Sequence, residues 1–551
     1  MWHQLPMRRF ALLSLALALG CASPAHPAPA AASPAPRVLT ILATSEVRGT
    51  PEPCGCQSDP LGDVARVASL VTEAKARGGV LLVDAGGLRY KSEPVKASEQ
   101  AQAELKARFL EQAWQGLGAA VGLGDEDLSA GVPSTPRLCS NCTVAPTAGF
   151  TVAGGALRDV GGVKVGVFGL LDPARAGDKV TASDPVAAAT REVAALSAGG
   201  AQVIVALAHL PRPEARRLAR SVPGLSIVVA GEAADSDSGD GAEAEQLGDT
   251  IVVQPAIEGQ RVAKVELHVV GGVVSTKLVA SAEGRARDLE KLGRKVKDAE
   301  LVLARLVKDP SADPAFVSSQ RARLAELAKA RDALRAPASE PPAGASFATA
   351  TLVPIRRALP RDPALATAMK KLDAEAGELN RTAGEKVPVP PAAPGEARYL
   401  GAEDCELCHP KQVEQWKTTV HAQAWKTLVD VNKQWSYDCI KCHVTGYGEA
   451  GGSAMAHVDK LEAVQCEVCH GPASLHAAAP RKQHLRVPVE SDCKRCHTRE
   501  HSDTFQFEAY LRDVLGPTHG AKRRAALGDG PTGHQLRGGA IEQAKAGAAQ
   551  R

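Results

Sequence analysis

Four copies of the pattern Cys-x-x-Cys-His lie close together in the C-terminal part of this 551-residue chain. Two thiols one helical turn apart can add to the two vinyl groups of one haem, and the adjacent histidine then lies under the iron as its proximal ligand. A zinc ribbon or a disulfide framework also uses Cys-x-x-Cys pairs, but neither requires a histidine after every second cysteine. The pattern therefore predicts four covalently attached c-type haems. The attachment residues are Cys405, Cys408, Cys439, Cys442, Cys466, Cys469, Cys493 and Cys496, and the proximal ligands are His409, His443, His470 and His497.

Histidines outside the boxes decide what each iron can do, because a sixth protein ligand closes the iron to substrate whereas an open position admits one. Seven further histidines follow residue 400, which is enough to close all four irons. Met455 is the only methionine in this region, so His/Met coordination is available to at most one haem. We expect mainly bis-histidine haems of low potential.

From about Tyr399 to His519 the chain resembles the tetrahaem cytochromes typified by the electron acceptor of hydroxylamine oxidoreductase. The matching stretches are YLGAEDCELCHPKQVEQWKTTVHAQAW, CIKCHVTGYG, VQCEVCHGPASLH and CKRCHTREHSDTFQFEAYL. The resemblance implies that His421 and His476 are distal iron ligands, with His519 and His484 as further candidates. It also implies a mainly α-helical domain that transfers electrons.

The small size of this region agrees with a haem-filled interior. About 120 residues with few aromatic side chains bury little apolar surface, so the four macrocycles themselves are expected to supply much of the core. The first cysteines of successive boxes are 34, 27 and 27 residues apart. So little intervening chain predicts that the haems are near neighbours and pass electrons from one to the next.

Residues 37–282 alternate apolar, β-rich runs with amphipathic helical segments, which predicts an α/β domain. The landmarks of this domain resemble the calcineurin-like metallophosphoesterase domain of bacterial 5'-nucleotidases, a sandwich fold. The stretch SEVRGTPEPCGC aligns with the family's Asn-Asp-x-His-Gly opening, LLVDAGG with its Asp-x-Gly-Asp strand end, GDED with Gly-Asn-His-Glu, LAHL with the central histidine and VVAGEAA with the late histidine pair.

The resemblance also implies that the catalytic metals are lost. A phosphoesterase of this kind uses two metals bridged by an aspartate, and Gly87 stands in the place of that aspartate. Arg48 stands where a histidine ligand is expected, and a guanidinium opposes the binding of two divalent cations. We expect a pseudoenzyme without functional phosphoesterase metals, although the remaining carboxylates, with Glu126, could hold one hard cation. The vestigial site comprises Glu46, Asp84, Asp125 and His209.

Four further cysteines in the first half are not haem boxes, because no histidine follows either pair. Cys54 and Cys56 are separated by one glycine, and Cys139 and Cys142 by two residues. In an oxidising compartment two disulfides are expected ahead of a four-thiolate zinc site, with their pairing left open.

The first residues have the features of an export signal. Arg8 and Arg9 precede an apolar run, Phe10 to Leu19, that is too short to span a bilayer. The following ALGC segment resembles a bacterial lipobox, with Ala18 in place of the usual leucine, and would make Cys21 a lipidated N-terminus. Ordinary cleavage in the next, Ala/Pro-rich stretch is the alternative. Either route exports the chain, and we expect a periplasmic or outer-membrane lipoprotein, exposed on either face, anchored to the membrane through Cys21.

The expected organisation follows from these segments. It is a signal peptide with lipobox (1–21), an Ala/Pro linker (22–36), the degenerate metallophosphoesterase-like domain (37–282), a helical connector (283–383), a Pro-rich linker (384–398), the tetrahaem domain (399–522) and a disordered tail (523–551). Within the connector, a helical hairpin is expected over 284–335 and a further helix over 362–380.

The leading functional hypothesis is electron transfer in the cell envelope, between redox protein donors and acceptors. A net charge of +3 gives no footprint for nucleic acid. Two enzymatic alternatives remain: a multihaem reductase of the nitrite or hydroxylamine type with one open haem, and a metal-dependent 5'-nucleotidase with an attached cytochrome.

Overall fold

The computed structural model describes residues 37–91, 94–232, 241–280, 282–335, 344–481 and 485–549. The predicted signal peptide, Cys21 and the Ala/Pro linker lie outside these ranges, as does the candidate ligand His484. Every helix in the described part of the chain is too short or too polar to cross a membrane.

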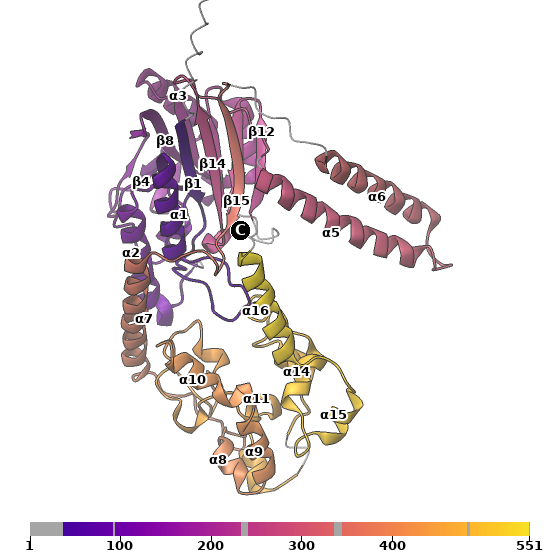
Figure 1. Cartoon of the computed structure of the whole chain (residues 1–551). Helices are drawn as coiled ribbons and strands as arrows, with labels where there is room; N and C mark the ends of the chain where they lie inside the picture. Colours follow the sequence, from indigo (N-terminus) through magenta and orange to yellow (C-terminus); the bar gives the residue numbers. More distant parts are fainter. Residues whose placement is uncertain are drawn as a thin grey trace, which may run out of the picture. The chain divides into compact units, whose positions relative to one another are not determined.

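Two β-sheets organise the first half of the protein (Figure 1). The five-stranded sheet has the order β15-β14-β1-β2-β3, in which β1, β2 and β3 are parallel and β14 runs antiparallel to both of its neighbours. Its strands are β1 (Arg37–Thr44), β2 (Gly79–Asp84), β3 (Ala120–Val121), β14 (Arg261–Val269) and β15 (Phe347–Pro354).

The six-stranded sheet has the order β12-β13-β11-β10-β8-β7, with a parallel centre and an antiparallel strand at each edge. Its strands are β7 (Ala156–Val160), β8 (Val163–Leu171), β10 (Val203–Pro211), β11 (Ile227–Glu232), β12 (Ala242–Leu247) and β13 (Thr250–Gln254). Two small ladders join β4 (Arg137–Leu138) to β6 (Val152–Ala153) and β5 (Cys142–Val144) to β9 (Val180–Ala182).

The two large sheets pack face to face. Their shared core contains Ile41 and Val265 from one sheet and Val165 and Val205 from the other, all of them fully buried. Parallel strands buried on both faces are apolar almost throughout, and β10 is buried at every position before its last residue. The α/β sandwich predicted for the first half is therefore confirmed.

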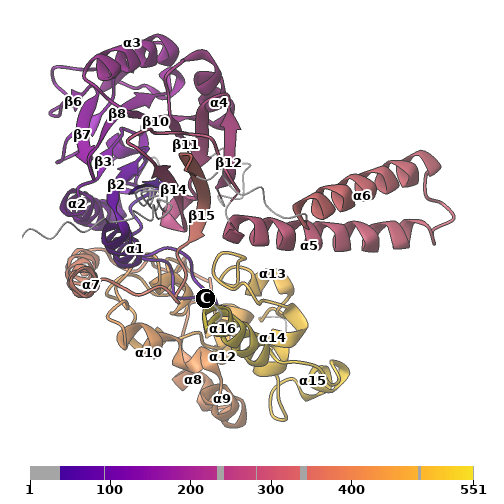
Figure 2. The same cartoon turned by 45° about the horizontal axis from the view of Figure 1, so that its top comes forward.

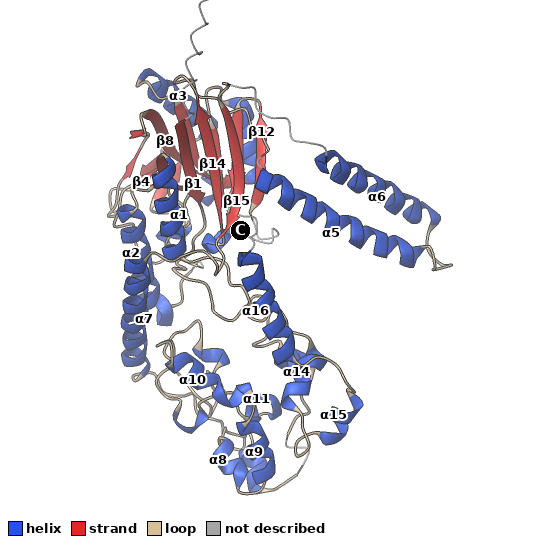
Figure 3. Ribbon diagram, in the orientation of Figure 1, coloured by secondary structure: helices blue, strands red, loops and turns tan. Residues whose placement is uncertain are grey.

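Helices cover the outer faces of the sandwich (Figure 3). Side chains of α1 (Val64–Arg77) and α2 (Gln100–Gly116) pack on the five-stranded sheet, and those of α3 (Pro185–Ala198) and α4 (Arg212–Ser221) pack on the six-stranded sheet. Aspartate caps start two of these helices: Asp63 accepts from Ala65 N at 2.8 Å, and Asp184 accepts from Ala187 N at 2.7 Å ahead of a proline at the first helical position.

The connector contains the expected helical hairpin, and α5 (Ala282–Leu306) and α6 (Pro314–Arg335) lie side by side in both views (Figures 1 and 2). It also contains β15, which pairs along its whole length with β14. The five-stranded sheet is thus completed by a strand beyond residue 282, where the sequence predicts the domain to end. The last connector helix, α7 (Pro363–Gly384), packs Leu372 and Ala376 against Leu105 of α2.

The C-terminal region is built of short helices with little apolar core of its own. One small cluster forms around Ile440, Val444 and Met455, with Trp425 and Trp435 packed against it. The helices are α8 (Ala402–Glu406), α9 (Pro410–Lys417), α10 (Ala424–Val429), α11 (Cys466–His470), α12 (Ser474–Ala478), α13 (Glu490–Cys493), α14 (Phe507–Val514), α15 (Ala521–Ala526) and α16 (Gly533–Ala549). The 3-10 turns η5 (Val420–Gln423), η6 (Ile440–Cys442) and η7 (Asp459–Leu461) also lie in this region, whereas η1 (Ala97–Glu99), η2 (Glu126–Leu128), η3 (Pro173–Arg175) and η4 (Ile257–Gly259) lie in the first half of the chain.

The tail corrects a prediction, because residues expected to be disordered form α15 and α16. The glycines of α16 lower its intrinsic helix propensity, and tertiary contacts outweigh this cost. The helix packs on α14, and the amide of His534 donates to Asp513 Oδ2 at 2.8 Å. Arg537 also donates a hydrogen bond to the carbonyl of Cys56.

Candidate functional sites

Each Cys-x-x-Cys-His box is folded as about one helical turn. In box 1 (405–409) and box 4 (493–497) the amide of the histidine donates to the carbonyl of the first cysteine, at 2.8 and 2.9 Å. Box 3 (466–470) is helix α11 itself, and box 2 (439–443) spans the turn η6. The two sulfurs and the imidazole of each box therefore come from one short turn, as covalent haem attachment requires.

Three of the four box histidines face a second imidazole. The ring centroids are 6.2 Å apart for His409 and His476, 6.2 Å for His421 and His497, and 5.9 Å for His470 and His519. In every pair one ring belongs to a box and the other lies outside the boxes. Three of the four predicted distal candidates thus lie opposite a proximal histidine.

The spacing of these rings fits an iron between them. With a metal–nitrogen bond of about 2.0 Å and about 1.1 Å from that nitrogen to the ring centre, two imidazoles on one metal have centroids about 6.2 Å apart. Rings in direct van der Waals stacking would lie closer together. The residues present fit a bis-histidine haem at boxes 1, 3 and 4.

Hydrogen bonds orient several of these rings. The Nδ1 atoms of His443, His470 and His476 lie 2.6, 3.2 and 3.1 Å from backbone carbonyl oxygens. A carbonyl only accepts hydrogen bonds, so Nδ1 carries the proton and Nε2 is left free to bind a metal. Burial lowers the pKa of His421, and the pKa of His497 to about 4, which keeps both imidazoles neutral as ligation requires.

Box 2 differs from the others. Among the described residues no aromatic or imidazole ring pairs with that of His443, while His484 lies outside them. The Nδ1 atom of His443 nevertheless donates to Ala424 O, which orients Nε2 for one axial bond. The orientation of His443 therefore fits the proximal ligand predicted for this box.

Cysteines of different boxes lie next to each other. The thiols of Cys405 in box 1 and Cys466 in box 3 lie close enough to shift each other's pKa, and so do those of Cys442 in box 2 and Cys496 in box 4. Groups attached at these sulfurs are therefore direct neighbours in two pairs.

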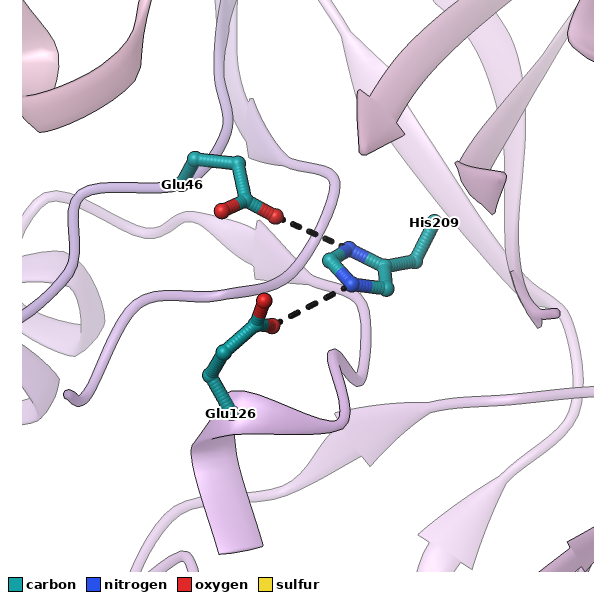
Figure 4. A group of neighbouring side chains, drawn as sticks. All are labelled: Glu46, Glu126 and His209. Atoms are coloured by element: carbon teal, nitrogen blue, oxygen red, sulfur yellow. Dashed lines mark ion pairs between the residues drawn. The ribbon is translucent and has the colours of Figure 1, made fainter. Parts of the chain in front are cut away.

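A second cluster lies in the sandwich, around the buried His209 at the end of β10 (Figure 4). Its Nδ1 atom is 3.6 Å from Glu46 Oε1, and its Nε2 atom is 3.0 Å from Asp125 Oδ1 and 3.3 Å from Glu126 Oε2. One ligand atom from each of Glu46, Glu126 and His209 fits within 4.8 Å of the others. Three of the four residues predicted for the vestigial site therefore meet here.

Asp84 is the exception. Its carboxylate accepts hydrogen bonds from Thr44 Oγ1 at 2.6 Å and from the amide of Gly86 at 2.9 Å, and it is not among the residues grouped around His209. Glu126, which aligns with the catalytic histidine of the phosphoesterase family, belongs to the cluster around His209 instead. Arg175 was missed altogether: it pairs with Glu232 at 2.8 Å and with Asp125 at 3.7 Å.

Charges within the protein neutralise this cluster. Arg48 binds Glu46 at 2.7 Å. Burial opposes protonation of His209, but its hydrogen bonds to Asp125 and Glu126 raise its pKa well above the ordinary value. Burial also raises the pKa of Glu46 to about 7. A cation that binds to Glu46, Glu126 and His209 would therefore compete with the proton on His209.

Gly87 explains why a bridging carboxylate is absent. Its φ is +72°, and a Cβ built on it would lie 3.0 Å from Glu46 Oε1 and 3.2 Å from Glu46 Cα. The side chain of Glu46 fills the space that an aspartate at position 87 would need. The two replacements are structurally linked.

The four cysteines of the first half behave differently from one another. Cys139 and Cys142 form a disulfide. Cys54 and Cys56 carry free thiols whose sulfurs are 2.7 Å apart. Among the described residues the structure therefore contains one disulfide where the sequence predicts two.

Comparisons with known proteins divide the chain in the same way. Residues 404–471 match the family described as cytochrome c554 and c-prime. Cytochrome c-554 of Nitrosomonas europaea is 34% identical over 93 residues, which cover 14% of this chain and 40% of that protein. The chain thus spans less than half the length of this curated relative.

Solved structures similar to the chain include a 5'-nucleotidase precursor, a sulfate thiohydrolase and a calcineurin-like phosphoesterase. The 5'-nucleotidase precursor of Thermus thermophilus has 18% identity and a TM-score of 0.41, covering 64% of this chain and 61% of its own. The sulfate thiohydrolase SoxB of Thermus thermophilus has 13% identity and a TM-score of 0.39, covering 61% and 60%. The calcineurin-like phosphoesterase YfkN of Bacillus subtilis has 18% identity and a TM-score of 0.33, covering 44% and 88%.

The cysteine pairs, the histidines beside them and the family match all fall in the same C-terminal region. The chain therefore combines an N-terminal α/β sandwich with a C-terminal region that is similar to the cytochrome c554 family over residues 404–471 and has the Cys-x-x-Cys-His boxes of a multihaem c-type cytochrome.

Proposed function

We propose that the protein transfers electrons through four haem c groups, at least three of them closed by two histidines. The observation that carries this proposal is the spacing of 5.9–6.2 Å between the three imidazole pairs. An iron with two imidazole ligands has no free position for a substrate, so it exchanges electrons without bond chemistry.

Different residues of the haem-binding region would attach the haems, bind the irons and bring neighbouring haems together. The eight box cysteines hold the haems covalently, and the orienting hydrogen bonds on Nδ1 fix the rings that bind iron. The bound haem supplies the ferrous–ferric couple. The contacts of box 1 with box 3, and of box 2 with box 4, support electron exchange between neighbouring haems.

The test is a pyridine haemochrome assay combined with electron paramagnetic resonance of the ferric protein, matured in a host competent for c-type haem attachment. We expect four haems per chain, with at least three of them low-spin. Fewer than four haems, or a signal that is mostly high-spin, would contradict the proposal.

A second candidate function rests on box 2. If the haem at His443 has no distal ligand, it could reduce a small oxyanion or hydroxylamine while the other haems deliver electrons. The described residues provide no ring opposite His443, which supports this candidate. Cyanide added to the ferric protein would then convert a high-spin signal of about one haem in four to low-spin, and nitrite or hydroxylamine would oxidise the reduced protein catalytically. A fully low-spin spectrum excludes this function.

We infer that the sandwich domain is not a phosphoesterase and serves as a docking or positioning module. The support is the ion-paired cluster around His209, together with the side chain of Glu46, which fills the space that an aspartate at position 87 would need. Hydrolysis of 5'-AMP or bis(p-nitrophenyl) phosphate in the presence of Mn²⁺, above the level of a His209→Ala variant, would favour the 5'-nucleotidase alternative instead.

We also propose that the protein is an exported, periplasmic or outer-membrane lipoprotein, anchored by a lipid on Cys21, and that it exchanges electrons with redox proteins of the envelope. The apolar run before Cys21 supports this location. Mass spectrometry of the mature N-terminal peptide tests it: a diacylglyceryl group on Cys21 is expected, and an unmodified N-terminus within residues 22–36 would contradict the anchor.

A further inference from the structure

The Cys54-Gly-Cys56 segment is unlike the other cysteines of the chain. It belongs to no haem box, and its two sulfurs lie 2.7 Å apart as free thiols. Cys54 is exposed and Cys56 is partly buried. Two thiols at this distance can close to a disulfide with little movement, and an exposed disulfide is readily attacked by other thiols.

The loop that carries these thiols is fixed against the haem-binding region. Gln57 Nε2 donates to the carbonyl of Glu500 at 2.8 Å, and the amide of Ser58 donates to Asp503 Oδ1 at 3.1 Å. Arg537 of α16 donates to the carbonyl of Cys56. Cys56 itself and the two residues that follow it therefore contact the region after box 4.

Glu52, at the start of the same loop, extends this contact toward box 2. It binds Lys433, which precedes box 2, and Arg361 at 3.2 Å. Cys54 also lies close enough to box 2 for its charge to act on the thiols of Cys439 and Cys442. The ion pair between Glu52 and Lys433 thus joins the loop that carries the free thiols to the segment leading into box 2.

The two thiols differ in reactivity. The hydrogen bond between the two thiols lowers the pKa of Cys54 to about 6, so the exposed sulfur of the pair loses its proton more readily. Cys139 and Cys142 show the opposite arrangement. They already form a disulfide, Cys139 is 3% exposed, and an apolar cluster surrounds the pair.

We propose that Cys54 and Cys56 form a redox-active dithiol–disulfide pair that passes electrons from external thiols to the haem attached at Cys439 and Cys442. This inference rests on the proposed function for the presence of that haem. The substrate class is a dithiol, either a small molecule or a protein with a reduced cysteine pair.

The reaction balances in two stages. In the first, a thiolate of the external dithiol attacks the Cys54–Cys56 disulfide, which gives a mixed disulfide and one free cysteine thiol. The second external thiol then attacks the mixed disulfide. The external dithiol leaves as a disulfide, and both Cys54 and Cys56 are reduced. In the second, two electrons leave the Cys54–Cys56 dithiol one at a time for two ferric haems. The sulfur–sulfur bond re-forms, two protons go to solvent, and two ferrous haems result.

The test compares the haem-loaded full chain with a Cys54→Ser/Cys56→Ser variant and with a Cys139→Ser/Cys142→Ser control, which also loses two cysteines. Each protein is oxidised with ferricyanide, freed of oxidant without oxygen, and titrated coulometrically. The uptake of electrons is divided by the haem content of the same sample. In parallel, dithiothreitol is mixed with the ferric protein and haem reduction is followed by absorbance, while iodoacetamide trapping and mass spectrometry report the state of Cys54 and Cys56.

We expect the wild type to take up about two electrons per chain more than its haem content, and the Cys54→Ser/Cys56→Ser variant to take up no excess. Reduction by dithiothreitol should be about tenfold slower in that variant and unchanged in the control. Alkylation of Cys54 should appear only after reduction. If the double variant fails to load haem, reduced wild type alkylated at Cys54 replaces it in both measurements.

Equal electron uptake and equal rates in all three proteins would overturn the inference. Reduction of every haem by dithionite in that case leaves the proposed electron-transfer function standing. If the wild type itself fails to bind haem, the result contradicts the proposed function. The two failures can be told apart because the excess of electrons is calculated from the haem content measured in each sample.

Discussion

Replacing His421 by alanine removes one imidazole of the His421–His497 pair and leaves the attachment of the haem intact. Cys493, Cys496 and His497 come from box 4, whereas His421 lies in η5, far away in the sequence. The variant should therefore keep its haem and lose only the sixth ligand of that iron. With three ring pairs in the structure, one loss converts about one third of the bis-histidine haems, or about one quarter of all haems, from low-spin to high-spin.

The assay is quantitative electron paramagnetic resonance of the ferric protein, with haem content measured on the same sample. Free imidazole should restore the low-spin signal, since it can occupy the space that the side chain leaves. His501→Ala is the matched control. His501 lies near the same box, but its Nδ1 atom is 2.8 Å from Thr498 Oγ1 and no imidazole pairs with it among the described residues. An unchanged spin state in His421→Ala, or an equal change in His501→Ala, would refute the interpretation of the ring pairs as axial ligands.

Further predictions concern the sandwich. Gly87→Ala should lower the free energy of unfolding by about 1–3 kcal/mol, because its φ is +72° and the new Cβ would contact Glu46. Gly118→Ala is the control, because Gly118 has a φ of +77° but no atom within 4 Å of an added Cβ. In urea denaturation the control should lose less free energy of unfolding than Gly87→Ala. Because burial raises the folded-state pKa of Glu46 from 4.5 to about 7, its contribution to stability is present below pH 4.5 and is lost as the pH rises to 7. Glu46→Gln should therefore show a flatter fall of melting temperature between pH 4.5 and 7 than the wild type, and parallel curves would contradict the assigned shift.

The sequence was sufficient where spacing alone decides the chemistry. The pattern of two cysteines and a histidine within one turn needs no tertiary information, and it locates every haem box. The apolar runs of β1, β8 and β10 likewise predict strands buried on both faces. These features were predictable because each depends on residues that are close together in the chain.

Features that depend on distant partners were harder to predict. His421 lies between boxes 1 and 2 in the sequence, yet its ring faces His497 of box 4, a pairing that no spacing reveals. The strand β15 follows a long helical hairpin and pairs with β14 across that insertion. Helix α16 forms from a glycine-rich segment because α14 and the loop at Cys56 hold it. In each case a tertiary contact outweighs the local signal.

The cluster around His209 was predicted incompletely for a related reason. Matching Asp84 to a metal ligand assumes that its carboxylate points into the site, but the hydroxyl of Thr44 and the amide of Gly86 hold it instead. Glu46 then fills the space beside Gly87 and reaches His209. Exchanging one residue of such a constellation changes the direction of the others, which a linear comparison does not show.

One loop contacts both the sandwich and the haem boxes. After β1, the amides of Glu46 and Arg48 donate to the carbonyls of Gly86 and Gly87, each at 2.8 Å, so the first part of the loop is fixed to the sandwich. Its later part, from Glu52 to Ser58, is fixed to residues around the haem boxes. The segment that aligns with the opening of a phosphoesterase metal site thus places an arginine-bound glutamate at one end and a free thiol pair at the other. The ion pair at one end of the loop and the contacts with residues around the haem boxes at the other suit the proposed role of this loop in coupling thiols to haem.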